Sequence, residues 1–128
     1  DSVYDGFFFY SSHLTEMALV PFGYDPRSLV AIEKNGSRTC VLRYDDYDVT
    51  LNYTKSTSVS TGVLIGKKAN VAREIDISMI YLQEVTAFIH ALQTGKVPFT
   101  REELVKPVAV INAIEESVRL GGKEVPIE

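Results

Sequence analysis

The sequence predicts an α+β fold: an open-faced, mostly antiparallel mixed sheet with helices packed on one face. Apolar residues recur at helical spacing near the start of the chain, and between residues 28 and 76 they alternate with polar residues. Helical spacing returns from residue 77 onward. Strands gathered between two helical stretches form a sheet with a separate helical layer, whereas a βαβ fold would alternate the two. Without repeats or an obvious linker, residues 1–128 are expected to form one domain.

The composition is that of an ordinary globular protein, with 45% hydrophobic and 23% charged residues. A net charge of −4 provides no basic field for nucleic acid or an anionic membrane, so neither is an expected partner. No apolar stretch approaches the roughly 20 residues that span a bilayer, and no secretory leader is recognised. Cys40 is the single cysteine, which excludes an internal disulfide and favours a reducing, cytoplasmic location.

A first helix is predicted over residues 6–20, and Pro21 with Gly23 supplies its stop. The four aromatic residues at its start could instead open a buried strand, because periodicity alone does not decide so short a run. In the helix, one stripe carries Phe9, His13 and Glu16, which lie three and four residues apart. The helical spacing itself is carried by Phe7, Tyr10, Leu14 and Met17.

A sheet is predicted from Ser28 to Asp76, with turns at Asn35-Gly36, at Asp45-Asp46 and at Gly66-Lys67. Its clearest unit is a hairpin with one apolar face, to be covered by helices, and one polar face left open to water or a partner. The predicted apolar face carries Cys40, Leu42, Tyr44, Val49, Leu51 and Tyr53; the polar face carries Arg43, Thr50, Asn52 and Thr54. The unbroken run Val63-Leu64-Ile65 is typical of a more central strand.

Two further helices follow. The first is predicted over residues 78–93 and ends at Gly95. The segment from Thr100 has the form of a capping box, but Pro107 would clash with a continuing helix, so a short turn is expected before a main helix that starts at about Lys106. That helix should stop at Gly121-Gly122, with a short edge strand after it.

The chain lacks the motifs that mark common catalytic and nucleotide sites. A dinucleotide-binding domain would show Gly-x-Gly-x-x-Gly between a strand and a helix, and none is present. Neither is a Walker A loop, a nucleophile elbow or a histidine and carboxylate cluster with metal-ligand spacing. Asp45, Asp46 and Asp48 are interpreted as turn residues and His90 as a helix-surface histidine, so no cofactor or metal site is assigned to this chain.

As a whole, the sequence resembles the C-terminal domain of the glucose-fructose oxidoreductase, inositol dehydrogenase and rhizopine-catabolism (Gfo/Idh/MocA) family. The resemblance extends over nearly the whole chain, through the order and spacing of its segments. They are Tyr4-Asp5-Gly6, Tyr10-Ser11-Ser12-His13, Glu16-Met17, Phe22-Gly23-Tyr24-Asp25, the stretch from Phe88 to Gly95, Pro107 through Ile114, Ser117 and Lys123-Glu124-Val125.

The resemblance implies a glyceraldehyde-3-phosphate dehydrogenase-like C-terminal domain. It would close the substrate cleft and form a homodimer through the open sheet face, in a cytoplasmic oxidoreductase acting on a sugar or polyol. NAD or NADP would be held by a separate N-terminal Rossmann domain, so this chain by itself would be inactive. The family's catalytic histidine, in an Asp-x-Gly-x-His pattern, matches His13, but Phe9 and Ser11 replace the aspartate and the glycine.

Substrate contacts are expected from Tyr10, above all, and from Phe9 and Ser12 beside His13. An imidazole suits the role of proton acceptor because it titrates near neutral pH, and Glu16 one turn later could orient it. For each of these residues a structural role is the competing interpretation, since aromatic residues at helical spacing are more often core. The alternative function is a non-catalytic ligand-binding or oligomerisation module.

Overall fold

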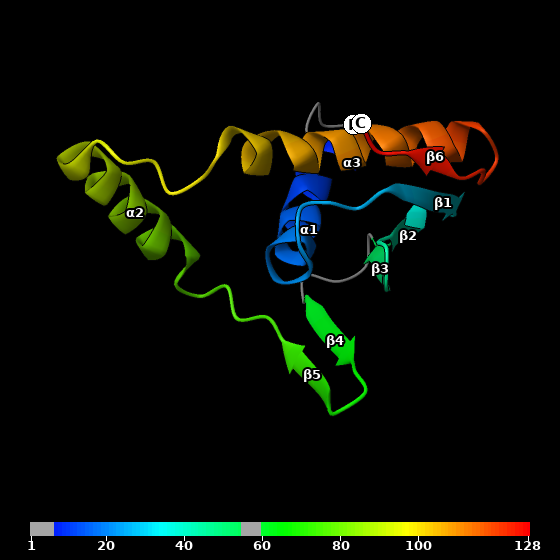
Figure 1. Ribbon diagram of the computed structural model, residues 1–128, viewed down its shortest axis with the longest axis horizontal. Coiled ribbons are helices and arrows are strands. Elements are labelled where there is room, and N and C mark those ends of the chain that lie inside the picture. The colour runs from blue at the N-terminus through cyan, green and yellow to red at the C-terminus, as the bar shows by residue number, and fades with distance from the viewer. Residues whose placement is uncertain (1–6, 55–59) are drawn as a thin grey trace. The chain divides into compact units, whose positions relative to one another are not determined.

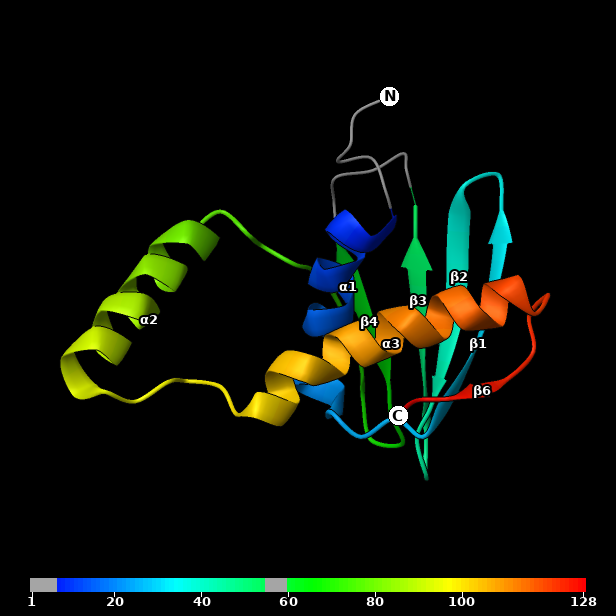
Figure 2. The ribbon, with the colours of Figure 1, turned by 90° about the horizontal axis from the view of Figure 1, so that it is seen from above.

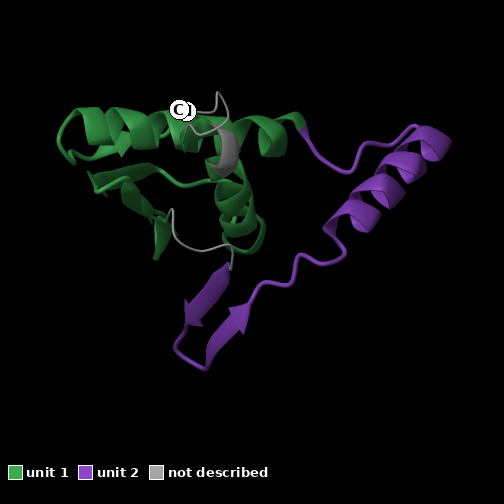
Figure 3. Cartoon of the chain, turned by 180° about the vertical axis from the view of Figure 1, so that it is seen from behind, with its two compact units in different colours: residues 1–55, 101–128 green, residues 56–100 purple. Residues whose placement is uncertain are grey.

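The computed structural model describes residues 7–54 and 60–128, with the side chains of Phe9 and Tyr10 outside the description. In these residues the chain forms three helices and two antiparallel sheets, which confirms the predicted α+β class (Figure 1). It divides into two compact units: residues 1–55 together with 101–128 make unit 1, and residues 56–100 make unit 2 (Figure 3).

The first helix, α1, spans Phe7–Phe22, close to the predicted bounds. One side of it is buried and includes Ala18 and Leu19. Pro21 is accommodated in the last turn, and the helix ends where the Gly23 N–H donates to the Leu19 carbonyl at 2.8 Å. Gly23 has a φ of +97°, a conformation that favours glycine at a helix end.

The main sheet of unit 1 consists of β1 (Ser28–Lys34), β2 (Ser37–Arg43), β3 (Asp48–Tyr53) and β6 (Val125–Pro126). The strand order is β3-β2-β1-β6, and every pairing is antiparallel. Asn35 and Gly36, with φ of +54° and +75°, form the two-residue turn between β1 and β2, as this sequence favours in a hairpin. The short terminal strand that the sequence predicts is confirmed as β6 at the edge.

The predicted two-faced character of the hairpin β2–β3 is confirmed. Leu51 pairs with Cys40 and Val49 with Leu42, and all four side chains are buried. They meet α1 and α3 (Arg101–Arg119), which lie on the same face of the sheet (Figure 2). The alternate residues of β3, Thr50 and Asn52, are exposed on the other face.

The expected break before the third helix is wrong, because α3 runs without interruption from Arg101 to Arg119 and passes through Pro107. Proline inside a helix removes one hydrogen bond and crowds the preceding turn. Here the bond lost is only that to Glu103, in the first turn, and the Pro107 ring is buried together with Val110 and Ile114. Burial of the ring offsets the lost bond, so the helix extends one and a half turns earlier than predicted.

The end of α3 falls where the two glycines predict it. The Gly121 N–H donates to the Val118 carbonyl, the Gly122 N–H donates to the Ser117 carbonyl, and both glycines have positive φ. This pair of bonds is a Schellman motif. It turns the chain so that β6 pairs with β1 at Leu29 and Val125.

Ser117 links α3 to the sheet through hydrogen bonds. Its buried hydroxyl accepts a hydrogen bond from the Ala31 N–H at 2.8 Å and donates one to the Lys123 carbonyl at 2.6 Å. A buried hydroxyl that is satisfied on both sides fixes helix, β1 and the C-terminal segment relative to one another.

Unit 2 contains β4 (Thr61–Ile65), β5 (Asn70–Glu74) and α2 (Ile80–Thr94). The turn at Gly66 and the end of α2 at Gly95, with φ of +69°, follow the prediction. The expectation of a central strand at residues 63–65 is wrong: among the described residues β4 pairs with β5 alone, and Ile65 is 82% exposed. An unbroken apolar run is typical of a strand that is buried on both faces, but such burial also requires other elements that pack on those faces.

Candidate functional site

The exposed stripe of α1 carries the residues that the sequence singles out for chemistry. His13 and Glu16 are exposed, Ser12 is half-buried, and Val20 continues the stripe toward the end of the helix. One turn of helix separates His13 from Glu16, so both side chains project from the same side of α1. The structure thus places Ser12, His13 and Glu16 on the outer surface of the helical layer.

The opposite side of α1 is fixed by a buried polar chain. The Thr15 hydroxyl donates to the Ser11 carbonyl at 2.8 Å, so its oxygen accepts from the Tyr53 hydroxyl at 2.9 Å. Burial is the main cause that raises the pKa of Tyr53, which therefore stays protonated as a donor. Phe7 adds an edge-to-face contact with the Tyr53 ring, at 5.1 Å between centroids. These contacts fix the orientation of α1 about its own axis. They therefore also fix the direction in which the His13 side chain projects.

Ser11 stands where the resembled family has glycine, and it is 3% exposed. Its hydroxyl is the one buried side-chain oxygen or nitrogen without a hydrogen-bond partner among the residues described. An unsatisfied buried hydroxyl costs about 1–3 kcal/mol. Ser11 therefore belongs to the interior of unit 1 and does not face the exposed stripe.

A carboxylate of α3, Glu103, acts electrostatically on Tyr24. Burial raises the pKa of Tyr24, and the negative charges of Glu103 and Glu16 raise it further. Both carboxylates therefore disfavour ionisation of the Tyr24 hydroxyl, which follows α1 in the chain. Sequence reasoning named Glu16 but missed Glu103, because no local spacing relates the start of α3 to the first helix.

Arg38 forms an ionic cluster near the start of α1. Its guanidinium bonds to Glu33 at 2.5 Å and to Glu115 of α3, and it lies 4.0 Å from the centre of the Phe7 ring. With only 14% of its side chain exposed, Arg38 connects β1, β2, α1 and α3. Two carboxylates and a ring face satisfy its charge, so its role in unit 1 is structural.

Phe9 and Tyr10, expected to contact substrate, fall outside the described side chains. Their backbone continues α1 after Phe8. Of the four residues predicted for the site, the structure thus locates His13 and Ser12.

Two carboxylates of the β2–β3 hairpin, those of Asp45 and Asp48, form ion pairs with arginines. Arg27 makes two bonds to Asp45 at 3.1 Å, and the bond to Arg27 lowers the pKa of Asp45. Asp48 pairs with Arg43.

Within residues 7–54 and 60–128, no group of three histidine, cysteine, aspartate or glutamate side chains is placed to hold a metal ion. None of the helices in those same ranges combines the length and apolar character that a bilayer crossing requires.

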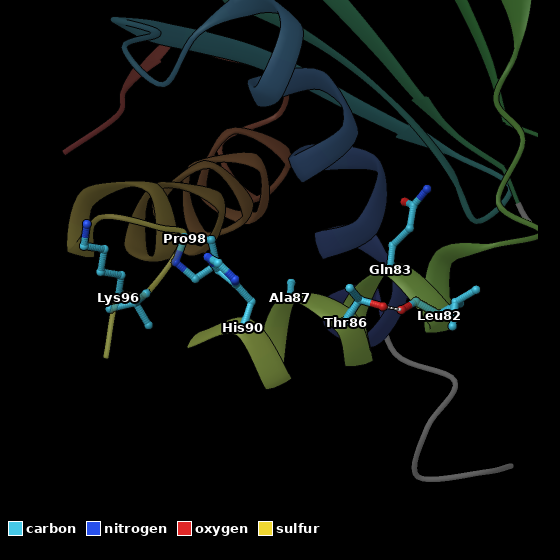
Figure 4. Close-up of a pocket in the computed structure, with 8 residues that line it drawn as sticks. Leu82, Gln83, Thr86, Ala87, His90, Lys96 and Pro98 are labelled. Carbon is cyan, nitrogen blue, oxygen red and sulfur yellow. Dashed lines mark hydrogen bonds between the residues drawn. The ribbon is translucent and has the colours of Figure 1, made fainter. Parts of the chain in front are cut away.

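Unit 2 contains a pocket of about 680 Å³ along α2 (Figure 4). His90, to which the sequence assigned no role, extends toward Pro98 in the turn that follows the helix. The pocket walls are mainly apolar, and they are formed by Leu82, Gln83, Thr86, Ala87, His90, Lys96, Val97 and Pro98. Apart from half-buried Ala91, every residue of α2 is exposed, so this pocket is a shallow surface groove.

Known proteins offer no further guide to the site. Comparison of the chain with models of protein families, with curated proteins and with solved structures found no match in any of the three.

Proposed function

We propose that this chain is the C-terminal substrate and dimerisation domain of a cytoplasmic NAD(P)-dependent oxidoreductase that acts on a sugar or polyol. The observation that carries the proposal is the layering of unit 1, with both of its helices on one face of a four-stranded antiparallel sheet. This layering agrees with the fold that the family resemblance implies. The buried single thiol of Cys40 is compatible with a reducing compartment.

In the proposed reaction, His13 accepts the hydroxyl proton of the substrate while the carbon-bound hydrogen leaves as hydride. Its exposed place on α1 allows a substrate to reach the imidazole. Glu16 can accept a hydrogen bond from the ring and set its tautomer, the part that the replaced aspartate would otherwise perform. Ser12 and the Tyr24 hydroxyl are hydrogen-bonding groups suited to a polyol.

The nicotinamide would receive the hydride, and this chain offers no glycine-rich turn to hold it. We therefore place the cofactor on the N-terminal domain of the parent protein. The contribution of the present residues is to bind and orient the alcohol and to remove its proton.

For dimerisation we propose the outer sheet face, defined as Val30, Ile32, Thr39, Val41, Thr50 and Asn52. Val30 pairs with Val41 across β1 and β2, and Val41 pairs with Thr50 across β2 and β3, so one row crosses three strands. Ile32 on the same face is 58% exposed. An apolar centre with hydroxyl and amide groups around it is the usual anatomy of a protein interface.

The catalytic part is tested by His13→Ala in the intact parent protein. Loss of a general base is expected to lower turnover by about 10²- to 10⁴-fold. Glu16→Gln, which keeps the size of the side chain, should have a smaller effect and alter the pH dependence. Full activity in the His13→Ala protein would exclude the catalytic role.

The dimerisation part is tested with two equal chemical changes. Val41→Glu places a charge in the centre of the outer sheet face, and Val20→Glu places one on α1, where the side chain is 68% exposed. Sedimentation should show a dimer for the unchanged chain and for Val20→Glu, but a monomer for Val41→Glu. Circular dichroism confirms that each variant is folded. A monomeric unchanged chain would exclude this interface.

The alternative is a non-catalytic ligand-binding or oligomerisation module. One observation favours it: the position of the family's glycine is taken by a buried serine, and that of its aspartate by Phe9. Under this alternative, His13→Ala leaves turnover of the parent unchanged, whereas Val41→Glu still disrupts assembly.

A further inference from the structure

The tip of the β1–β2 hairpin presents an asparagine followed by a glycine. Lys34 and Ser37 form the last pair of the two strands, and Asn35 and Gly36 join them (Figure 2). Asn35 is exposed, and among the described residues it is the one non-glycine residue with positive φ. The same two residues that make this turn are also a reactive pair.

We propose that Asn35 is a site of spontaneous deamidation that proceeds through a cyclic imide with Gly36. The Gly36 backbone nitrogen gives up its proton to solvent base and attacks Cγ of Asn35. The new N–Cγ bond closes a five-membered ring, and the Cγ–Nδ2 bond breaks with release of ammonia. Water then opens the ring at either carbonyl and leaves aspartate or isoaspartate at position 35. The reaction consumes one water molecule overall and needs no oxidant or metal.

Two features of this turn favour the reaction. Gly36 has no Cβ to hinder the approach of its nitrogen to Cγ of Asn35. Ring closure also requires the turn to open for a moment, and the residues from Ile32 to Gly36 are all exposed. Opening releases the Lys34–Ser37 pair and leaves the buried residues of both strands in place, and such fraying at a tip requires little free energy.

The other three asparagines are less favourable and serve as internal controls. Asn52 precedes Tyr53 in β3, Asn70 precedes Val71 in β5, and Asn112 precedes Ala113 in α3. Each following residue carries a Cβ, and each asparagine lies in a hydrogen-bonded element. Asn35 should therefore react first.

The reaction has a structural consequence because isoaspartate adds one main-chain atom to a two-residue turn. The strand pair next to the closing pair is Glu33 with Arg38. Arg38 also bonds Glu115 of α3 and contacts the Phe7 ring. A shift at the tip thus acts directly on the ionic cluster that connects the strands with both helices.

The test is to age the full chain under native conditions in mildly alkaline buffer and to follow all four asparagines by peptide mapping and mass spectrometry. We expect Asn35 to be lost at least roughly tenfold faster than the other three, with isoaspartate as a product, because only Asn35 is followed by a residue without a Cβ and its turn opens locally. Equal rates at the four asparagines, or loss of Asn35 only in denaturant, would overturn the proposal.

The matched control is Asn35→Gly, which keeps a residue suited to left-handed backbone and removes the reacting amide. The unchanged chain should lose thermal stability as Asn35 reacts, and the Asn35→Gly chain should keep its stability over the same period. Equal losses in both chains would refute the coupling to the Arg38 cluster.

Discussion

Units 1 and 2 use similar apolar side chains with opposite results. Leu42 in β2 is fully buried, whereas Leu82 in α2 is 58% exposed. Unit 1 stacks two helices on a four-stranded sheet, so each apolar stripe meets another. Within unit 2, a two-stranded hairpin and one helix provide no layer that covers them, and α2 contains no buried residue. Apolar periodicity thus predicts which elements form, whereas burial of their apolar faces requires a partner layer.

The largest expected difference comes from truncating one leucine in each unit. Leu42→Ala leaves a cavity in the core and should lower the free energy of unfolding by about 2–5 kcal/mol. Leu82→Ala removes an exposed side chain and should change it by less than about 0.5 kcal/mol. Urea unfolding of both variants measures this. An equal cost for Leu82→Ala would mean that α2 is covered in solution.

Ser117→Ala tests the hydrogen bonds that link α3 to the sheet. Removal of the hydroxyl leaves the Ala31 N–H without its buried acceptor, and a loss of about 1–3 kcal/mol is expected in denaturant unfolding. The comparison in unit 2 is Thr94→Ala, which deletes an exposed hydroxyl bonded to the His90 carbonyl. That variant should be nearly neutral, and a neutral Ser117→Ala would contradict the proposed link.

High pH should weaken unit 1 through its buried thiol. Burial raises the pKa of Cys40 to about 12, whereas an exposed thiol of the unfolded chain ionises at about 8.5. Between these values the unfolded chain has lost this proton and the native chain keeps it, so the free energy of unfolding falls as pH rises. The expected slope is about 1 kcal/mol per pH unit.

The check is a series of urea midpoints across this alkaline range for the unchanged chain and for Cys40→Ala. The variant starts from a lower stability because of its cavity, but its decline with pH should be shallower. Tyr44, whose pKa burial raises to about 12, and Tyr53, whose pKa burial also raises, add to the slope equally in both proteins. Identical slopes would show that Cys40 is not shielded from solvent.

The smallest expected effect distinguishes the two helix ends. Gly121 and Gly95 have φ of +72° and +69°, and a Cβ at either position would meet nothing within 4 Å. Substitution of either glycine by alanine therefore costs only backbone strain, about 1 kcal/mol. In Gly121→Ala the cost should appear in global unfolding, and in Gly95→Ala only as faster hydrogen exchange at the end of α2. Global destabilisation by Gly95→Ala would mean that α2 unfolds together with unit 1.

Much of the fold could be predicted from local patterns. The first helix, the Asn35-Gly36 turn, the buried face of the β2–β3 hairpin and the glycine stops of the last two helices all depend on neighbouring residues. Local spacing also placed His13 and Glu16 on one stripe, as the structure confirms. These features follow from local backbone preferences and side-chain periodicity, and both can be inferred from the order of neighbouring residues.

The rest depended on which surfaces meet. Burial decided that α3 continues through Pro107, and the lack of a covering layer among the described residues left Val63 to Ile65 exposed. The electrostatic effect of Glu103 on Tyr24 and the hydrogen bond from the Ala31 N–H of β1 to Ser117 link segments far apart in the chain. Local sequence patterns are enough to predict which elements form and which face of each is apolar. Which of those faces are covered follows from the packing of the elements, because the burial of a residue depends on its partner as much as on the residue itself.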